Sequence, residues 1–211
     1  MEYIERGTKQ EVIYWAKRLY EKGMSPSTSG NISTKTDKGI LISASGTCMY
    51  DMDENDVVLI DYSGNLIEGN KRASSEQIMH SEIYTMNDEI NAIIHCHCPV
   101  LSAFAVADKP IKKPILPDFA LLFDEVPVVP YFCPSSIDLA TTVGEYFKKY
   151  TCVLLKNHGI ILGADSLQNA FYQLEVLRSY AETYFGAEIL GGAKAISKKD
   201  VLEIKTLYSK K

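Results

Sequence analysis

The sequence of 211 residues lacks the features that mark membrane and secreted proteins. No apolar run approaches the ~20 residues that a helix needs to cross a bilayer. The most apolar stretch, residues 92–107, is interrupted by two histidines, a proline and a serine. Residues 1–5 lack the basic and apolar regions of a secretory signal. The five cysteines are an odd number without the spacing of a disulfide scaffold, so we expect reduced thiols in a cytoplasmic protein.

Clustered positive charge is also scarce. Lysine and arginine number 22 against 27 acidic residues, which gives a net charge of −5. The densest basic spots within the sequence are pairs, such as Lys148-Lys149 and Lys198-Lys199. Nucleic-acid binding needs a broad basic surface, so it is excluded as a main function. A small phosphate remains an allowed ligand, because backbone amides and hydroxyls bind it without changing the net charge.

Apolar spacing predicts one α/β domain that spans residues 1–211. A hydrophobic content of 46% supplies a sizeable core. Helices are expected over 9–22, 74–86, from Pro99 onward, over 135–149, after a cap at Asp165, and over 197–207. Strands are expected over 31–36, 39–43, 56–61, 92–97, 152–155 and 160–162. The early hairpin argues against a purely parallel sheet, so we predict a three-layer α/β/α sandwich with a mixed, mostly antiparallel sheet.

Two finer expectations concern the second helix and the proline-rich segment. Within 74–86, the side chains of Ile78, Ile83 and Met86 are expected to face the core. Residues 108–134 hold six of the eight prolines. Because proline interrupts both helices and central strands, this segment is predicted to be loops with one short strand near 128–131.

Histidine is rare, and three of the four copies form a pattern. His95 and His97 lie two apart in a predicted strand, so both imidazoles point to one face. His158, in the turn Asn157-His158-Gly159, can complete a three-ligand site that leaves a position open for substrate. From the residues alone, core or turn histidines are an equally open interpretation, and His80 fits a hydrogen-bonded role. The interleaved cysteines at 96 and 98 should face the other way as small buried hydrophobes.

Short hydroxyl side chains and free amides gather in three segments. These segments are residues 28–31, 43–46 and 74–75. Each fits an ordinary cap or turn, but together they can cradle a phosphate, the last one at a helix start whose dipole favours an anion. Glu76 follows directly. It is either a first-turn glutamate that stabilises the helix or a general base beside a metal ion.

These motifs, in this order and spacing, resemble the class II aldolase/adducin family over residues 9–208. The resemblance rests on Ser29-Gly30-Asn31-Ile32-Ser33, Ile42-Ser43-Ala44-Ser45-Gly46, Ser74-Ser75-Glu76 with His80, His95-Cys96-His97, and His158-Gly159. It implies one zinc ion, or another divalent metal, held by His95, His97, His158 and Glu76, with Glu76 also the acid/base catalyst. It implies phosphate binding by Thr28, Gly30, Asn31, Ser45, Gly46, Ser74 and Ser75. It also implies a homotetramer with active sites at subunit interfaces.

The resemblance implies a lyase that splits a ketose 1-phosphate, with L-fuculose 1-phosphate expected to give dihydroxyacetone phosphate and L-lactaldehyde through a metal-stabilised enediolate. An L-ribulose-5-phosphate 4-epimerase is the alternative, although such epimerases usually carry aspartate in place of Glu76. A methylthioribulose-1-phosphate dehydratase, a non-catalytic adducin-like interaction module and an unrelated zinc hydrolase are further alternatives. Retention of three histidines and Glu76 argues against the interaction module.

One departure concerns the aldehyde side of the site. The similar aldolases carry a mid-chain tyrosine that helps proton transfer, whereas this sequence reads Ile115-Leu116-Pro117-Asp118-Phe119-Ala120. Asp118 is the candidate that takes the place of that tyrosine. Tyr208 falls near a C-terminal tyrosine that, by the resemblance, reaches a neighbouring subunit's site. A tyrosine in a frayed tail is the competing interpretation of Tyr208.

Overall fold

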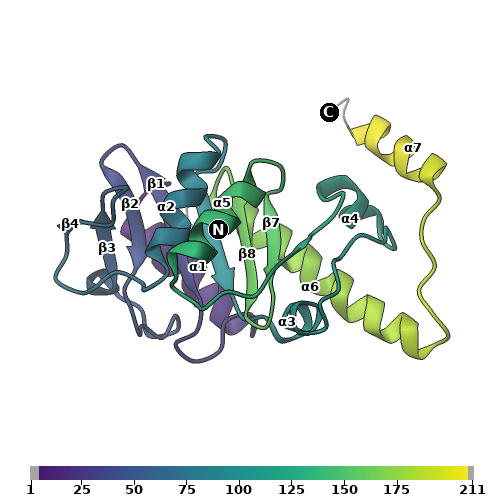
Figure 1. Ribbon diagram of the computed structural model, residues 1–211, viewed down its shortest axis with the longest axis horizontal. Coiled ribbons are helices and arrows are strands. Elements are labelled where there is room, and N and C mark those ends of the chain that lie inside the picture. The colour runs from purple at the N-terminus through teal and green to yellow at the C-terminus, as the bar shows by residue number, and fades with distance from the viewer. Residues whose placement is uncertain (1–4, 209–211) are drawn as a thin grey trace.

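A computed structural model describes residues 5–208, so residues 1–4 of the N-terminal segment considered above lie outside it. The strands are β1 (Asn31–Thr36), β2 (Gly39–Ser43), β3 (Val57–Ile60), β4 (Leu66–Glu68), β5 (Ala92–Cys96), β6 (Val128–Val129), β7 (Cys152–Leu155) and β8 (Gly159–Ala164). They form one sheet in the order β4-β3-β2-β1-β5-β8-β7-β6 (Figure 1). Only the β6–β7 pair is parallel, which confirms the mixed, mostly antiparallel sheet.

Helices cover both faces of the sheet. On one face lie α1 (Lys9–Glu21), α3 (Pro99–Val106) and α6 (Leu167–Ile189), which share an apolar cluster with the sheet. On the other face lie α2 (Gln77–Met86) and α5 (Ile137–Phe147), which form a second cluster. This arrangement is the predicted three-layer sandwich. A short 3₁₀ helix, Glu54–Asp56, leads into β3.

Two helices lie outside the three layers. α4 (Pro117–Leu122) and α7 (Lys198–Tyr208) contact each other at one end of the molecule, where α7 stands apart from the sheet (Figure 1). No residue of α7 is buried. We call residues 190–208 the C-terminal arm. Leu190, Leu202 and Leu207 of this arm are exposed in the single chain, whereas Ala193 is buried.

β5 is the central strand that connects the core to the site. All five of its residues are buried, and successive side chains alternate between the two faces. Cys96 and the following Cys98 join the cluster under α1, α3 and α6, as predicted. Ile93 joins the cluster under α2 and α5, and His95 shares its face. The strand thus directs one imidazole toward the start of α2.

The structure corrects three sequence predictions. The segment 108–134 contains helix α4 as well as loops, because Pro117 is compatible with the first turn of a helix and Phe119 is buried. On α2 the buried positions are Met79, His80, Ser81, Ile83 and Tyr84. Of the three predicted core positions Ile83 is buried, Met86 is half-buried and Ile78 is exposed. The sequence pattern missed this phase because a polar His80 occupies a core position. β4 was not predicted either, since its three residues are all exposed.

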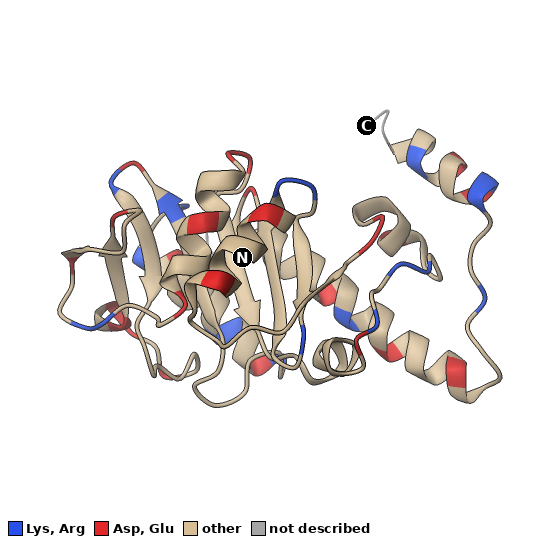
Figure 2. Ribbon diagram, in the orientation of Figure 1, with Lys and Arg blue, Asp and Glu red and all other residues tan. Residues whose placement is uncertain are grey.

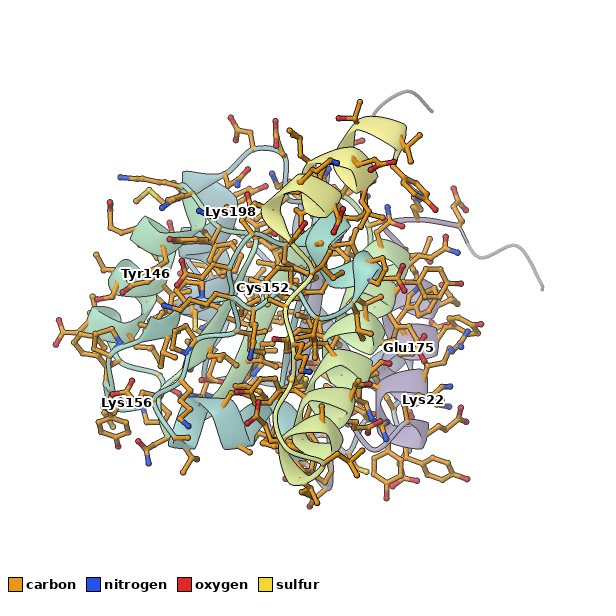
Figure 3. The ribbon with its side chains drawn as sticks, turned by 90° about the vertical axis from the view of Figure 1, so that its right-hand side faces the viewer. Lys22, Tyr146, Cys152, Lys156, Glu175 and Lys198 are labelled. Carbon is orange, nitrogen blue, oxygen red and sulfur yellow. The ribbon has the colours of Figure 1, made fainter. Side chains whose placement is uncertain are left out.

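Polar contacts fix the outer helices. The cap of α6 is Ser166 rather than Asp165: its hydroxyl accepts from the amide of Asn169. Lys22 at the end of α1 pairs with Glu175 of α6 at 3.2 Å (Figure 3). Lysine and arginine lie on separate helices and loops rather than in one stripe (Figure 2). No helix within residues 5–208 has the length and apolarity needed to cross a membrane.

Candidate active site

Three imidazoles meet at the end of β5. His95 lies within the strand, His97 directly follows it, and His158 occupies the turn between β7 and β8. The Nε2 atoms of His95 and His97 are 3.1 Å apart. The three ring centroids lie 4.7–5.0 Å from one another. One nitrogen of each ring lies within 4.8 Å of the corresponding nitrogens of the other two. We call these residues the imidazole cluster; they can hold a metal ion.

The backbone of the β7–β8 turn places His158. Asn157 adopts a left-handed conformation with φ of 56°, which asparagine tolerates better than most residues. Gly159 then passes close to β5. A Cβ at this position would lie 2.6 Å from the Cys96 carbonyl oxygen and 2.9 Å from the His97 ring. Glycine is therefore required for His158 to approach the other two rings.

Glu76 brings a carboxylate to the imidazole cluster. It occupies the N-cap position of α2 and is buried, with 7% of its surface exposed. Its Oε2 lies 3.2 Å from His95 Nε2, and its Oε1 lies 3.6 Å from His158 Nε2. The Asn31 amide donates to Oε2 at 2.9 Å. The side chain thus points into the site, and it does not cap the helix with a hydrogen bond.

The donor atoms fit a small divalent cation. Ligands about 2.1 Å from a tetrahedral zinc ion lie about 3.4 Å from one another. The separations between His95 and His97, His95 and Glu76, and His158 and Glu76 are 3.1–3.6 Å, close to this value. His95 Nδ1 lies 2.9 Å from the carbonyl oxygen of Ile160. Because a carbonyl only accepts, Nδ1 carries the proton, which leaves the Nε2 lone pair for a metal. Glu76 Oε1 is buried without a hydrogen-bond partner, as expected of a carboxylate oxygen that can bind a cation.

The close packing of Glu76 and the three imidazoles shifts their pKa values. Burial opposes ionisation of Glu76, yet the neighbouring His95 and His158 and the hydrogen bond from Asn31 hold its pKa well below the ordinary value. Burial and the adjacent His95 lower the pKa of His97 and of His158 to about 4. Both rings are therefore neutral at neutral pH, which is the form that binds metal ions. For His95, burial is outweighed by the Glu76 carboxylate, so its pKa is raised.

A cavity of about 210 Å³ opens beside this cluster. Its walls include every residue that the sequence predicts for phosphate binding. These are Thr28, Gly30, Asn31, Ser45, Gly46, Ser74 and Ser75. Backbone hydrogen bonds join two of the predicted segments, from the amide of Ser74 to the carbonyl of Ser43 and from the amide of Ser45 to that of Arg72. Segments far apart in the sequence therefore present hydroxyls and amides to one space.

Glycine is necessary at the first of these segments. Gly30 has φ of 80°, a conformation that disfavours side chains. A Cβ there would lie 2.6 Å from the His95 carbonyl oxygen and 2.7 Å from the Ser25 hydroxyl. The backbone around the cavity can approach β5 this closely only because residue 30 has no side chain.

Four further residues line the cavity: Ser29 and Ala44, which lie within two of the predicted segments, and Pro134 and Ser135, which were not predicted. Ser135 adopts φ of 64°, which is uncommon for a residue other than glycine. It precedes Ser136, whose hydroxyl caps α5. The pair Ser135-Ser136 is a hydroxyl cluster like the other three, and this was the available signal. It was missed because the serines belong to the start of a predicted helix.

Asp118 and Tyr208 lie elsewhere. Asp118 is an exposed residue on α4, and Tyr208 is 58% exposed at the end of α7. Neither lines the cavity that contains Glu76 and the imidazole cluster. Within one chain the structure thus gathers the predicted metal and phosphate residues and leaves these two apart.

Known proteins resemble this chain over most of its length. A protein of Methanococcus maripaludis named L-fuculose phosphate aldolase is 31% identical, and the match covers 82% of this chain and 93% of that protein. A 5-deoxy-D-ribulose 1-phosphate aldolase of Bacillus thuringiensis is 30% identical, with 92% and 91% covered. A 3-oxo-tetronate 4-phosphate decarboxylase of Pectobacterium atrosepticum is 28% identical, with 95% and 93% covered.

The fold and a family-level match agree with these relatives. A solved structure described as L-fuculose 1-phosphate aldolase superposes with a TM-score of 0.89 at 29% identity and covers 98% of both chains. Residues 10–185 match the model of the Class II Aldolase and Adducin N-terminal domain. This chain therefore belongs to the class II aldolase and adducin family.

Proposed function

We propose that this protein is a metal-dependent aldolase that cleaves a ketose 1-phosphate into dihydroxyacetone phosphate and an aldehyde. L-Fuculose 1-phosphate, which yields L-lactaldehyde, is the proposed substrate. The main support is one juxtaposition: Glu76 and two members of the imidazole cluster, His97 and His158, line the same cavity as the hydroxyls and glycines. Two relatives at about 30% identity are named as aldolases of sugar phosphates.

The imidazole cluster is proposed to hold the metal, with Glu76 as the fourth ligand before substrate enters. Zinc is the proposed ion, since neutral imidazoles and a carboxylate in tetrahedral spacing suit it. When bound, the ion supplies Lewis acidity for the negative charge that develops on the ketose oxygens. Ile160 keeps His95 in the tautomer whose Nε2 faces this position, through the bond to Nδ1.

The remaining residues bind the phosphate and move protons. Hydroxyls of Ser74 and Ser75 and the amides near Gly30 and Gly46 surround the phosphate. In cleavage the C4 hydroxyl loses its proton to a basic group on the aldehyde side, and the electrons of the C3–C4 bond pass to the C2 carbonyl as the bond breaks. C3 then gains a proton from Glu76, which is ionised at rest and takes that proton up from solvent. Glu76 delivers the proton to C3, because it is the carboxylate within this cavity that also faces the metal position.

The aldehyde side is proposed to be completed by a second copy of the chain in a homotetramer. Asp118 and Tyr208 carry groups able to transfer protons, and both lie outside the cavity of their own chain. The C-terminal arm that bears Tyr208 has exposed apolar side chains, including Leu202 and Leu207, that a neighbouring copy would cover.

A decarboxylase of a 3-oxo-tetronate 4-phosphate is the second candidate, since a relative so named matches 95% of this chain. The two reactions share a phosphate, a metal and a negative charge that develops next to a carbonyl, but they differ in the bond that breaks. An epimerase reaction on a ketose 5-phosphate is separated from both by its product.

The test is a panel of ketose 1-phosphates, ketose 5-phosphates and 3-oxo-tetronate 4-phosphate, assayed with and without a chelator. The proposal expects release of dihydroxyacetone phosphate from a ketose 1-phosphate and loss of that activity with chelator. Release of carbon dioxide alone would establish the decarboxylase instead, and epimer formation would establish the epimerase. Purified protein that binds no metal and cleaves nothing would point to an interaction module.

A further inference from the structure

A line of buried polar side chains leads from Glu76 into the core. The Asn31 amide nitrogen donates to Glu76 Oε2 at 2.9 Å, and Asn31 Oδ1 lies 2.6 Å from His80 Nε2. His80 Nδ1 lies 2.7 Å from the Ser33 hydroxyl, which in turn lies 2.8 Å from the Tyr84 hydroxyl. We call Asn31, His80, Ser33 and Tyr84 the relay. Each of its members is less than 5% exposed.

The carboxylate determines the direction of the first bonds. An ionised Glu76 only accepts, so Asn31 must present its NH₂ group to it, and the Asn31 oxygen must face His80. An amide oxygen also only accepts, so His80 Nε2 must carry a proton. The reversed amide would place two oxygens together in a buried site, which is strongly unfavourable.

Burial determines the remaining bonds. Burial and the nearby His95 lower the pKa of His80 to about 3, so its ring is neutral and Nδ1 has no proton. The Ser33 hydroxyl must therefore donate to Nδ1. The Ser33 oxygen then accepts from Tyr84, whose pKa is raised by burial and which keeps its proton. Every member of the relay has one permitted orientation.

We propose that this relay is a positioning device for Glu76: it holds Oε2 in place and leaves Oε1, which has no hydrogen-bond partner, as the oxygen that faces His158 and the reacting carbon. This inference rests on the proposed function. It gives the Asn31 side chain a role beyond phosphate binding, because both ends of its amide are already engaged. It also assigns a role to His80, which touches neither the cavity nor the imidazole cluster.

His80 is the critical member because it prevents rotation of the amide. Without an N–H donor at position 80, Asn31 Oδ1 is buried without a partner, and the amide can turn away from Glu76. The carboxylate then loses its only hydrogen bond from an uncharged group. A small displacement of a proton-transfer group costs rate rather than substrate affinity, because the phosphate contacts are unchanged.

The experiment compares three variants of the full-length protein. His80→Leu removes the donor and preserves the bulk. His80→Gln restores an N–H for Asn31 and an acceptor for Ser33. Ile83→Ala is the matched control, since Ile83 is fully buried on the same helix and makes no polar contact. For each variant, kcat and KM for the ketose 1-phosphate are measured, together with the visible spectrum of Co²⁺ titrated into the metal-free protein.

We expect His80→Leu to lower kcat by about 10-fold or more, with KM changed by less than about threefold, and to alter the Co²⁺ spectrum. His80→Gln should recover kcat to within about threefold and restore the spectrum. Ile83→Ala should lower the melting temperature and leave both readouts unchanged. A wild-type kcat and spectrum for His80→Leu would overturn the inference, and so would a His80→Gln variant as impaired as His80→Leu.

The two proposals fail in distinguishable ways. If the wild-type protein cleaves no member of the sugar-phosphate panel, the proposed function fails, and the Co²⁺ spectra alone then decide the relay. If the wild-type protein cleaves its substrate but substitutions at residue 80 change neither kcat nor the Co²⁺ spectrum, only the proposal of the relay fails.

Discussion

The end of β5 and the C-terminal arm carry their functional candidates under opposite physical conditions. At the end of β5, His95 is fully buried and Glu76 nearly so, and both are fixed by hydrogen bonds to the backbone or to Asn31. In the arm, α7 has no buried residue, and Tyr208 is 58% exposed. One region is complete within the chain, whereas the other presents its side chains outward.

This difference separates chemistry that needs fixed geometry from chemistry that can be supplied at an interface. Under the proposed function, metal ligands must keep their separations within a few tenths of an ångström, and the imidazole cluster accordingly lies on a sheet strand and a glycine-constrained turn. A group that meets the aldehyde would need to arrive only when copies associate. The predictions below test the two regions in turn.

The largest effect is expected from His95→Ala. Loss of this buried ligand should remove the bound metal and lower cleavage by about 10³-fold or more, since the metal supplies several kcal/mol of charge stabilisation. Metal content is measured by elemental analysis of protein purified without chelator, and cleavage by release of dihydroxyacetone phosphate. A variant that keeps one ion per chain would show that His95 is not a ligand.

Glu76→Gln should separate catalysis from metal binding. The amide keeps the shape of the side chain but cannot transfer the proton, so cleavage should fall by roughly 10²-fold or more while the three imidazoles retain the ion. Metal content and kcat are compared in the same preparation. Cleavage at the wild-type rate would remove Glu76 from the role of acid/base catalyst.

Gly159→Ala tests whether the turn determines the spacing of the imidazole cluster. The added methyl group would overlap the Cys96 carbonyl and the His97 ring, so we expect a loss of about 1–3 kcal/mol in unfolding free energy and weaker metal binding. Gly186→Ala is the control, because nothing lies within 4 Å of its Cβ position and it occupies a helix. That change should stabilise the protein by about 0.5–1 kcal/mol. Equal stability of the two variants in urea unfolding would contradict the geometry.

Proton release on metal binding tests the charge state of the same cluster. His97 and His158 have pKa values of about 4 and are neutral at pH 6, so they release nothing. Despite burial, Glu76 raises the pKa of His95, so at pH 6 its proton must leave before the ion binds. The affinity of the protein for Zn²⁺ should therefore fall about tenfold for each pH unit below the pKa of His95. Calorimetric Zn²⁺ titrations at pH 6, in two buffers of different ionisation heat, should report the release of about one proton for each ion bound. Release of no proton, or of three, would contradict these charge states.

The sequence supported the sheet and the site better than it supported the irregular parts. Residues 39–43 and 92–97 have apolar patterns, and a clear turn at Asp37-Lys38 joins residues 39–43 to the more polar strand 31–36, so the hairpin follows from local chemistry. The prediction that the His95 and His97 side chains lie on the same face agrees with the structure, because side chains two residues apart share a face in any strand. The convergence of His158 did not follow from spacing at all; it rested on the resemblance, since only the tertiary fold joins β8 to β5.

The features that the sequence analysis did not predict have a common physical cause. α4, the exposed Ile78 and the buried His80 are all cases in which tertiary contacts outweigh the local pattern. His80 is buried because two polar neighbours, Ser33 and Asn31, satisfy its ring nitrogens, and a single sequence does not show which neighbours those are. Likewise Pro134 and Ser135 reach the cavity through the path of a loop, which neither propensity nor periodicity determines.

The smallest effect is expected from the arm. Tyr208→Phe removes one hydroxyl from an exposed helix, so unfolding free energy should change by less than about 0.5 kcal/mol and metal content not at all. If a neighbouring copy uses this hydroxyl, kcat for cleavage should still fall, by up to about tenfold, and the loss should be greater for cleavage than for exchange of the C3 proton of dihydroxyacetone phosphate. Under the proposed function, that exchange requires Glu76 and the metal but no aldehyde. Asp118→Asn, measured in the same way, separates the two candidates for the aldehyde side. An unchanged cleavage rate in both variants would contradict a role on the aldehyde side for either residue and would leave the residues around the end of β5 as the candidates for every proton transfer.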